Sequence, residues 1–254
     1  MADDTDDYIL QTSGLTRRFG GFTAVKDVDL NVKRYAVHAL IGPNGAGKST
    51  CFNLLTKFLP PTSGTITYNG VDITRHSATS IARMGLVRSF QISAVFGQLT
   101  VLENIRTALQ RRTGVALKFW VPLSAMSRLD EEASAILEGV GLAPFLHIRA
   151  GELPYGRKRA LEIATTIALD PEMMLLDEPT SGLGTEDIDK VVELIGSAAK
   201  GRTVVMVEHN LGVVAGLCDR VTVLQRGAIL AEGSYEAIAR DARVVEAYVG
   251  GEDE

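Results

Sequence analysis

The sequence predicts an α/β fold, with a mostly parallel sheet covered by helices on both faces. The chain has 254 residues, a length that encloses a substantial core. Hydrophobic residues make up 46% and charged residues 22%, which is typical of a globular domain and excludes a disordered or fibrous chain. Strand-like and helix-like runs alternate along the chain, as they do in parallel sheets with crossover helices.

The N-terminal part contains mainly short strand patterns and one helix. An apolar run that leads into a glycine-rich turn predicts a buried strand at 36–41. The segment 48–58 that follows the turn predicts a helix, ended by Pro60 and Pro61. The remaining predicted strands of this part are 8–13, 25–32, 65–68 and 85–89.

From about residue 91 to residue 154 the pattern changes. Segments 101–111 and 129–140 and a segment near Pro144 are helical in pattern, and strand patterns are lacking. We interpret this part as an inserted helical subdomain. Strands and helices then alternate again, over 156–169 (helix), 173–176 (strand), 185–200 (helix), 203–207 (strand), 221–225 (strand) and 228–231 (strand).

Charge and composition narrow the classes of function and the compartment. The formal net charge is −5 and the sequence pI about 5.5, which disfavours a nucleic-acid-binding protein. Cys51 and Cys218 are too few for a disulfide framework or a cysteine-rich zinc site. No apolar run is long enough to span a membrane, and the acidic first residues lack the pattern of a signal peptide. These features predict a cytoplasmic chain.

Residues 42–49, Gly-Pro-Asn-Gly-Ala-Gly-Lys-Ser, match the phosphate-binding P-loop pattern in full. Glycines let backbone N–H groups turn towards phosphate oxygens, and the following helix directs its positive dipole end at the same anion. Lys48 would reach the β- and γ-phosphates, and the Ser49 hydroxyl would ligate Mg²⁺. The alternative is a glycine-rich turn with an incidental Lys-Ser pair, which the strand before the loop and the helix after it disfavour.

A second candidate site follows the apolar strand 173–176. Asp177 and Glu178 stand at its end, where a central strand would deliver both carboxylates to the phosphates. Asp177 would hold Mg²⁺, directly or through water, and Glu178 would act as general base for the attacking water. The alternative is a strand that ends in two solvated acids.

Further motifs occur in a fixed order along nearly the whole chain. They are Phe19, Gln91 in Arg-Ser-Phe-Gln, 153–157 (Leu-Pro-Tyr-Gly-Arg), 181–184 (Ser-Gly-Leu-Gly) and His209 after Val-Glu. Together with the two acids and the P-loop, they resemble the ATP-binding cassette (ABC) ATPases. The resemblance matches them to the adenine-stacking aromatic, the Q-loop, the signature motif, the D-loop and the switch histidine. Taken singly, Phe19 could be a core aromatic, Gln91 a solvated loop residue and His209 an ordinary helix-start residue.

The resemblance implies a P-loop NTPase (RecA-like) core with an N-terminal antiparallel β subdomain and an inserted α-helical subdomain. It places the core at 1–90 and 158–254 and the helical subdomain, with the signature, at 91–157. Nucleotide contacts are expected at Phe19, Val25, Gly42, Asn44, Gly45, Ala46, Gly47, Lys48, Ser49, Thr50, Tyr155 and Gly156. Catalytic roles are expected for Lys48, Gln91, Glu178 and His209, and Mg²⁺ ligands are expected at Ser49, Gln91 and Asp177.

Several stretches are most similar to the ATP-binding subunits of branched-chain amino-acid importers. They are 15–21, 82–88, Tyr155-Gly156 with 159–164, and 244–250. Two positions depart from the general ABC pattern. Pro154 replaces the signature serine and so offers neither a hydroxyl nor an N–H, although proline suits the first turn of a helix. Gly184 ends the D-loop, where Asp or Asn is common in the family.

The resemblance implies a head-to-tail dimer, in which ATP lies between one subunit's P-loop and the other's signature. Expected partners are ATP and ADP, a second identical or different ATP-binding subunit, transmembrane permease subunits and, indirectly, an extracellular or periplasmic solute-binding protein. Segments 92–99 and 115–123 are candidate permease contacts, although the second could instead be core of the helical insert. The expected location is the inner face of the cell membrane.

Three functions remain to be distinguished. The first is the ATPase of an amino-acid importer or, alternatively, of a related transporter for urea, amides or other small solutes. The second is an ABC ATPase that acts apart from transport. The third is a binding module without hydrolysis, which Glu178 and His209 disfavour.

Overall fold

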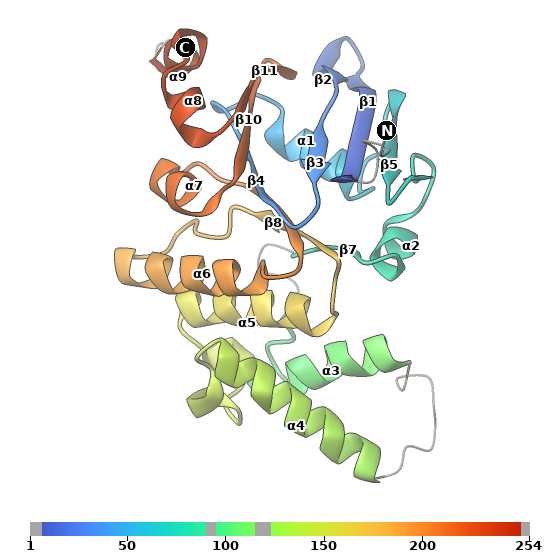
Figure 1. Cartoon of the computed structure of the whole chain (residues 1–254). Helices are drawn as coiled ribbons and strands as arrows, with labels where there is room; N and C mark the ends of the chain where they lie inside the picture. Colours follow the sequence, from blue (N-terminus) through green and yellow to red (C-terminus); the bar gives the residue numbers. More distant parts are fainter. Residues whose placement is uncertain (1–6, 90–94, 115–122, 250–254) are drawn as a thin grey trace. The chain divides into compact units, whose positions relative to one another are not determined.

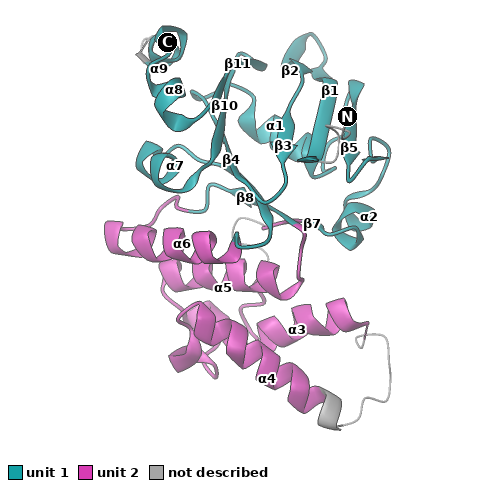
Figure 2. Ribbon diagram, in the orientation of Figure 1, with its two compact units in different colours: residues 1–86, 173–179, 199–254 teal, residues 87–172, 180–198 magenta. Residues whose placement is uncertain are grey.

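The predicted buried strands lie in the middle of one sheet (Figure 1). The structure is a computed structural model that describes residues 7–89, 95–114 and 123–249. The described residues form two compact units (Figure 2). Unit 1 comprises Met1–Leu86, Met173–Pro179 and Ala199–Glu254, and unit 2 comprises Val87–Glu172 and Thr180–Ala198. The predicted boundaries at 90/91 and 157/158 stay a prediction, since these units follow a different division.

Within the described residues, unit 1 contains an antiparallel sheet of five strands, ordered β2-β1-β5-β6 with β3 also paired to β1. Its strands are β1 (Tyr8–Phe19), β2 (Phe22–Val28), β3 (Asn31–Lys33), β5 (Ser63–Tyr68) and β6 (Val71–Asp72). The predicted strand 25–32 is thus two strands, β2 and β3. The two strands are separated at residues 29–30, and Asp27, within β2, has a left-handed φ of 47°.

The second sheet has six strands among the described residues, ordered β11-β10-β4-β9-β8-β7. They are β4 (Val37–Ile41), β7 (Leu86–Arg88), β8 (Met173–Asp177), β9 (Thr203–Val207), β10 (Arg220–Gln225) and β11 (Ala228–Gly233). Strands β10, β4, β9 and β8 run parallel, and β11 pairs antiparallel with β10. All residues of β4, β8 and β9 are buried, as expected for central parallel strands covered on both faces.

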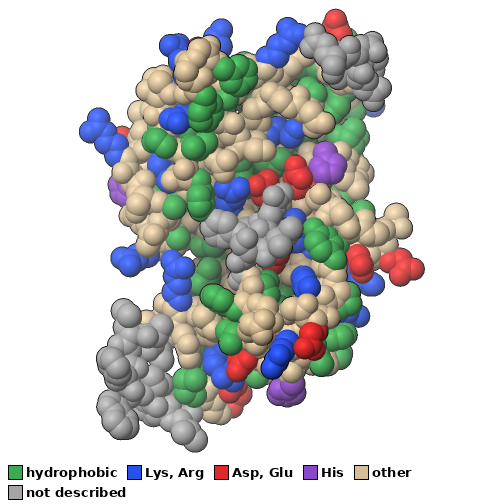
Figure 3. All heavy atoms as spheres, turned by 180° about the vertical axis from the view of Figure 1, so that it is seen from behind, with side chains coloured by type: hydrophobic (Ala, Val, Ile, Leu, Met, Phe, Trp, Pro, Cys, Tyr) green, Lys and Arg blue, Asp and Glu red, His purple; other side chains and the backbone are tan. Residues whose placement is uncertain are grey.

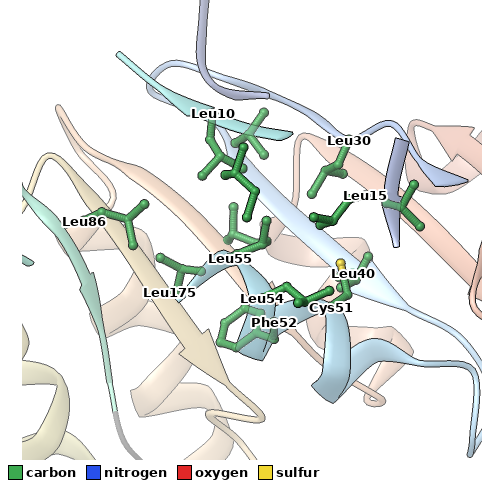
Figure 4. Close-up of a cluster of buried hydrophobic side chains, with 14 of the residues drawn as sticks. Leu10, Leu15, Leu30, Leu40, Cys51, Phe52, Leu54, Leu55, Leu86 and Leu175 are labelled. Carbon is green, nitrogen blue, oxygen red and sulfur yellow. The ribbon is translucent and has the colours of Figure 1, made fainter. Parts of the chain in front are cut away.

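Helix α1 (Lys48–Leu55) supplies one buried face to the main core of unit 1. Figure 4 shows its Cys51, Phe52, Leu54 and Leu55 among side chains from both sheets. Leu10 comes from the antiparallel sheet. The helix ends earlier than the predicted residue 58, because Lys57 has a left-handed φ of 60°. This core fixes the helix that begins at the P-loop lysine.

Unit 2 is built from helices around its own core. Its helices are α3 (Val101–Thr113), α4 (Leu123–Gly139), α5 (Tyr155–Ala168) and α6 (Thr185–Ala198). Helix α3 begins at a capping box, in which the Thr100 hydroxyl accepts the Glu103 N–H and the Glu103 carboxylate accepts the Thr100 N–H. The segment near Pro144 is a short 3₁₀ turn, Ala143–Phe145. The helical character predicted for this part is confirmed.

Four short helices of unit 1 have no counterpart in the sequence predictions. They are α2 (Ala78–Arg83), α7 (Leu211–Leu217), α8 (Tyr235–Ala239) and α9 (Ala242–Val249). Each spans at most about two turns, so the periodic pattern that reveals a longer helix is lacking. Helices α8 and α9 end the described chain and pack on each other and on β11.

Candidate functional site

Three chain segments of unit 1 meet at one edge of the parallel sheet. Val207 at the end of β9 is paired with Leu40 of β4 and with Asp177 of β8. Parallel strands in register present their carboxyl ends at the same edge. The P-loop follows β4, Glu178 follows β8, and His209 follows β9 by two residues. The structure therefore brings together the loop, the acidic pair and the histidine that the sequence predicted separately.

At two glycines, the path of the P-loop leaves no room for a side chain. Gly42 has φ 148°, and a Cβ there would lie 2.1 Å from the Leu224 carbonyl oxygen. Gly47 has φ 97°, and a Cβ there would lie 2.4 Å from the Ala24 carbonyl oxygen. Neighbouring backbone thus fixes both ends of the loop. Of the other predicted contacts, Asn44, Gly45 and Ser49 are exposed, Thr50 is half-buried and Ala46 is buried.

Helix α1 begins at Lys48 with Gly47 as its N-cap, so no side chain caps its first-turn N–H groups. Such uncapped amides, together with the helix dipole, suit an anion. The Lys48 ammonium donates hydrogen bonds to the carbonyl oxygens of Gly42 at 2.7 Å and Pro43 at 3.0 Å. Partial burial lowers the pKa of Lys48, and the nearby Glu178 carboxylate opposes that shift. The Lys48 ammonium and the Glu178 carboxylate therefore interact electrostatically.

The two acids at the end of β8 differ in their surroundings. Asp177 is the last residue of the strand and is 8% exposed. Glu178 has a left-handed φ of 46°, a conformation that is uncommon for a residue with a side chain. Its N–H donates a 2.9 Å hydrogen bond to the Val207 carbonyl oxygen, which holds this strained backbone in place. Strain of this kind clusters at functional sites.

Glu208 holds the turn that presents His209. Its side chain is fully buried, and its carboxylate accepts the N–H groups of His209 at 2.9 Å and Asn210 at 3.1 Å. The His209 side chain is exposed. Sequence reasoning missed this supporting role of Glu208. The available signal was an acid directly after the apolar, β-branched strand 203–207, where a buried carboxylate needs hydrogen-bond donors nearby.

Tyr248 of α9 is a second residue that sequence reasoning missed. Its hydroxyl lies near the backbone N–H of Gly42, the first residue of the P-loop. Burial raises the pKa of Tyr248, and the Gly42 N–H opposes this shift. A contact between residues so far apart in the sequence leaves no local pattern. The C-terminal helix thus supports the start of the phosphate loop.

The predicted adenine contacts fall in two different places. Phe19 ends β1 at the turn to β2, and its side chain is 42% exposed. The Arg17 guanidinium lies over its ring, 4.6 Å from the centroid. Val25 of β2 is fully buried in the core of unit 1, so its side chain offers no surface to a ligand. Phe19 fits an aromatic platform, whereas Val25 is part of the core.

In unit 2, the predicted signature forms the start of α5. Pro154 is the N-cap, and its carbonyl oxygen accepts the Lys158 N–H at 3.0 Å. The Tyr155 hydroxyl donates a hydrogen bond of 3.2 Å to the Ser181 carbonyl oxygen of the D-loop. A Cβ at Gly156 would lie 2.6 Å from an Asp187 carboxylate oxygen. Tyr155 therefore links the signature to the D-loop inside unit 2.

Gln91 and most of the segment 115–123 lie outside the described residues, as do 92–94. Ser49 and Asp177 offer the hydroxyl and carboxylate oxygens that Mg²⁺ prefers, at the same sheet edge. The described residues contain no larger cluster of His, Cys, Asp and Glu that would hold a metal by itself. Such a pair fits an ion that completes its shell with phosphate and water oxygens.

On the face in Figure 3, basic, acidic and apolar side chains are interspersed. Across the described residues, no helix combines the length and the apolar character that a membrane span requires.

Comparisons with known proteins match this arrangement. A sequence profile described as "ABC transporter" matches residues 25–181, and one described as "Branched-chain amino acid ATP-binding cassette transporter" matches residues 228–254. The chain is 39% identical to the high-affinity branched-chain amino acid transport ATP-binding protein LivG of Salmonella typhimurium. It is 40% identical to BraF of Pseudomonas aeruginosa, described in the same terms. Both matches cover 95% of this chain and 98% of the relative.

Solved structures agree with the sequence matches. A nucleotide-free ATP-binding cassette from an ABC transporter matches with a TM-score of 0.82 and 31% identity, over 95% of this chain and 98% of that one. The ADP conformation of an ABC transporter cassette matches with the same TM-score and 30% identity, over 96% and 99%. The predicted P-loop α/β fold is thereby confirmed. The chain belongs to the ABC transporter ATP-binding proteins, which are ATPases that power transport.

Proposed function

We propose that this chain is the ATP-hydrolysing subunit of an importer for branched-chain or other small amino acids. One observation carries the chemistry: the P-loop, the acidic pair and His209 stand at one edge of the sheet in unit 1. The cargo class is supported by the profile match at 228–254 and by relatives named for branched-chain amino acid transport.

The loop and its lysine would hold the phosphates of ATP. First-turn amides of α1 donate to the phosphate oxygens, and Lys48 turns from its loop carbonyls to the β- and γ-phosphates. Because burial lowers the pKa of Lys48, its ammonium is poorly hydrated and gains from an anion that replaces the lost water. Phe19 would stack on the adenine ring.

Glu178 would accept the proton of the water that attacks the γ-phosphate, since it stands beside Lys48 at the end of β8. His209 would contact the γ-phosphate, held there by the buried carboxylate of Glu208. Gln91, the predicted Q-loop residue, would complete the site. Hydrolysis then removes the γ-phosphate, which is the group that these residues contact together.

Ser49 and Asp177 would hold Mg²⁺, with Gln91 as the third predicted ligand. When bound, the ion neutralises negative charge on the phosphates. Asp177 suits this role because its buried carboxylate keeps a defined position at the strand end.

The start of α5 would serve a second subunit. Tyr155 and Gly156 face the phosphates of an ATP held by that subunit's P-loop, in a head-to-tail dimer that is either homomeric or heteromeric. With Pro154 as N-cap, the backbone amides of Tyr155 and Gly156 provide the donors in place of the missing serine hydroxyl. ATP binding closes such a dimer and hydrolysis opens it, which drives the permease.

The assembly would include permease subunits in the membrane, with this chain on the cytoplasmic face, and a solute-binding protein outside. Part of the predicted permease contact 92–99 is described, and its Phe96 is 58% exposed. Outside the predicted segments, Ile148 of the same unit is 40% exposed. Exposed apolar side chains suit a protein contact. The segment 115–123 stays a second candidate for this contact.

Uptake measurements test the proposal. Deletion of the gene is expected to abolish energy-dependent uptake of labelled leucine, isoleucine and valine. The intact gene restores this uptake, and the Lys48→Ala gene does not. Unchanged amino-acid uptake with loss of urea or short-amide uptake would instead favour the related small-solute transporters. Unchanged uptake of all these solutes would contradict an import function.

A further inference from the structure

Arg17 and Phe19 form a pair on β1, just before the chain turns into β2. Residues two apart on a strand share a face, and the Arg17 guanidinium carbon lies 4.6 Å from the centre of the Phe19 ring. Across the hairpin, Arg17 pairs with Val25 and Phe19 with Phe22. The register of the hairpin shifts between Arg17 and Arg18, so the pair stands at a β-bulge, beside the turn Gly20–Gly21.

The guanidinium is held in this place from a second side. Its Nη1 donates a 2.9 Å hydrogen bond to the carbonyl oxygen of Pro60, in the segment after the P-loop helix α1. The Arg17 Nε is buried and has no hydrogen-bond partner. A cation with less water around it interacts more strongly with an aromatic face. The ring contact is thus a main interaction of this guanidinium, and the Pro60 carbonyl fixes its position.

This arrangement leaves the ring open on one side only. Phe19 is 42% exposed, although the guanidinium covers one of its faces. The exposed area therefore belongs to the opposite face and the ring edge. A flat ring with a covered back and an open front is suited to offset stacking with another aromatic ring. Holding the ring in one orientation before binding reduces the entropy that stacking would otherwise lose.

We propose that Arg17 is a positioning residue for the adenine ring: it covers the back of Phe19 and presents the open face to the base. This rests on the proposed function, in which Phe19 stacks on adenine. Arg17 touches neither the base nor the phosphates in this account and acts through the Phe19 ring. Its effect is therefore confined to ligands that contain a base.

Calorimetric titration of the full-length chain tests the proposal, with ADP and inorganic tripolyphosphate as the probes, each with Mg²⁺. Arg17→Met keeps a long apolar side chain but removes the cation. We expect it to weaken ADP binding about fivefold, the size of a partly desolvated cation–π contact, and to leave tripolyphosphate binding unchanged. Equal weakening of both probes, or no change in ADP binding, would overturn the proposal.

Arg18→Met is the matched control, because Arg18 is the exposed neighbour with the same charge. It is expected to affect ADP and tripolyphosphate alike, if at all. Loss of ADP binding in Arg18→Met equal to that in Arg17→Met would assign the effect to general charge and contradict the positioning role. Thermal unfolding of each variant verifies that the hairpin is folded.

Phe19→Ala separates this inference from the proposed function. If Phe19 stacks on adenine, this variant weakens ADP but not tripolyphosphate binding. Arg17→Met then adds nothing further in the double variant, because the ring through which it acts is gone. If the effects of the two substitutions on ADP binding add up in the double variant, the role of Arg17 is overturned, but the adenine site at Phe19 is not. Unchanged ADP binding in Phe19→Ala would overturn the adenine site, and the role of Arg17 with it.

Discussion

The sheet edge of unit 1 and the start of α5 in unit 2 are the two proposed nucleotide contacts, and they differ in the groups that they offer. In unit 1, Lys48, Glu178 and His209 follow neighbouring buried strands, and each has backbone held by hydrogen bonds or neighbouring chain. In unit 2, Pro154 lacks an N–H and the Tyr155 hydroxyl is engaged by the D-loop. Unit 1 therefore offers side chains for the proposed chemistry, whereas α5 offers chiefly backbone amides and Gly156.

The difference teaches where departures from a family pattern are tolerated. A general base and a phosphate-binding lysine depend on the particular side chain, so both match the family residues in this chain. A helix start can bind an anion through its amides, and Pro154 lies just before the first amide of α5. The comparison predicts that variants in unit 1 change nucleotide binding and chemistry, whereas variants at α5 change turnover only.

Lys48→Ala is expected to produce the largest effect, because it removes the P-loop cation that is proposed to hold the phosphates. We expect kcat/KM for ATP to fall about 100- to 1,000-fold, as for removal of one catalytic donor from a preorganised site. Steady-state ATPase assays measure the loss. The control is Lys200→Ala, an exposed lysine of unit 1, which is expected to leave kcat/KM unchanged. Near-normal activity of Lys48→Ala would contradict the proposal that ATP is hydrolysed at the sheet edge of unit 1.

Gly156→Ala tests the other side of the comparison. Its Cβ would meet the Asp187 carboxylate, so the side chain or the helix start must shift. We expect ATP turnover to fall about tenfold, equivalent to about 1.4 kcal/mol, while ADP affinity stays normal. Gly139→Ala is the matched control, since open space surrounds that position on α4. Weaker ADP binding by Gly156→Ala would place α5 in the chain's own site.

Tyr248→Phe tests whether the C-terminal helix supports the P-loop. The change removes the hydroxyl beside the buried Gly42 N–H, and loss of an acceptor for a buried donor costs about 1–2 kcal/mol. For a chain of this size, that corresponds to a drop of roughly 2–8 °C in Tm. Tyr35→Phe, at an exposed tyrosine, is expected to leave Tm unchanged. Equal Tm values for Tyr248→Phe and the wild type would show that the contact contributes nothing.

Pro154→Ser is expected to have the smallest effect. Serine restores the hydroxyl of the family pattern and caps the α5 N-terminus, which stabilises a helix by about 0.5–1 kcal/mol relative to an uncapped start. If backbone amides already provide the phosphate contacts, ATP turnover changes less than about twofold, which is below 0.5 kcal/mol. A tenfold rise in turnover would show that the missing hydroxyl limits this chain.

The sequence contained enough to predict the fold class and the residues at the sheet edge, because each motif directly follows a buried strand. The strands β4, β8 and β9 lie within or close to their predicted ranges, since wholly apolar runs are distinctive. The break between β2 and β3 was not predicted, since the alternating apolar pattern continues through residues 29–30. Tyr248 was missed because its contact with Gly42 is set by tertiary packing.

The rate of ATP hydrolysis by the Glu178→Gln variant tests most directly the central claim that Glu178 acts as the general base. Single-turnover hydrolysis and ATP affinity are measured on the same preparation of full-length protein. The amide keeps the size of the side chain but cannot accept the proton, so hydrolysis is expected to slow at least about 100-fold. Affinity for ATP is expected to stay within about twofold of the wild type, below 0.5 kcal/mol. Hydrolysis at the wild-type rate would contradict the role of Glu178 and with it the account of unit 1.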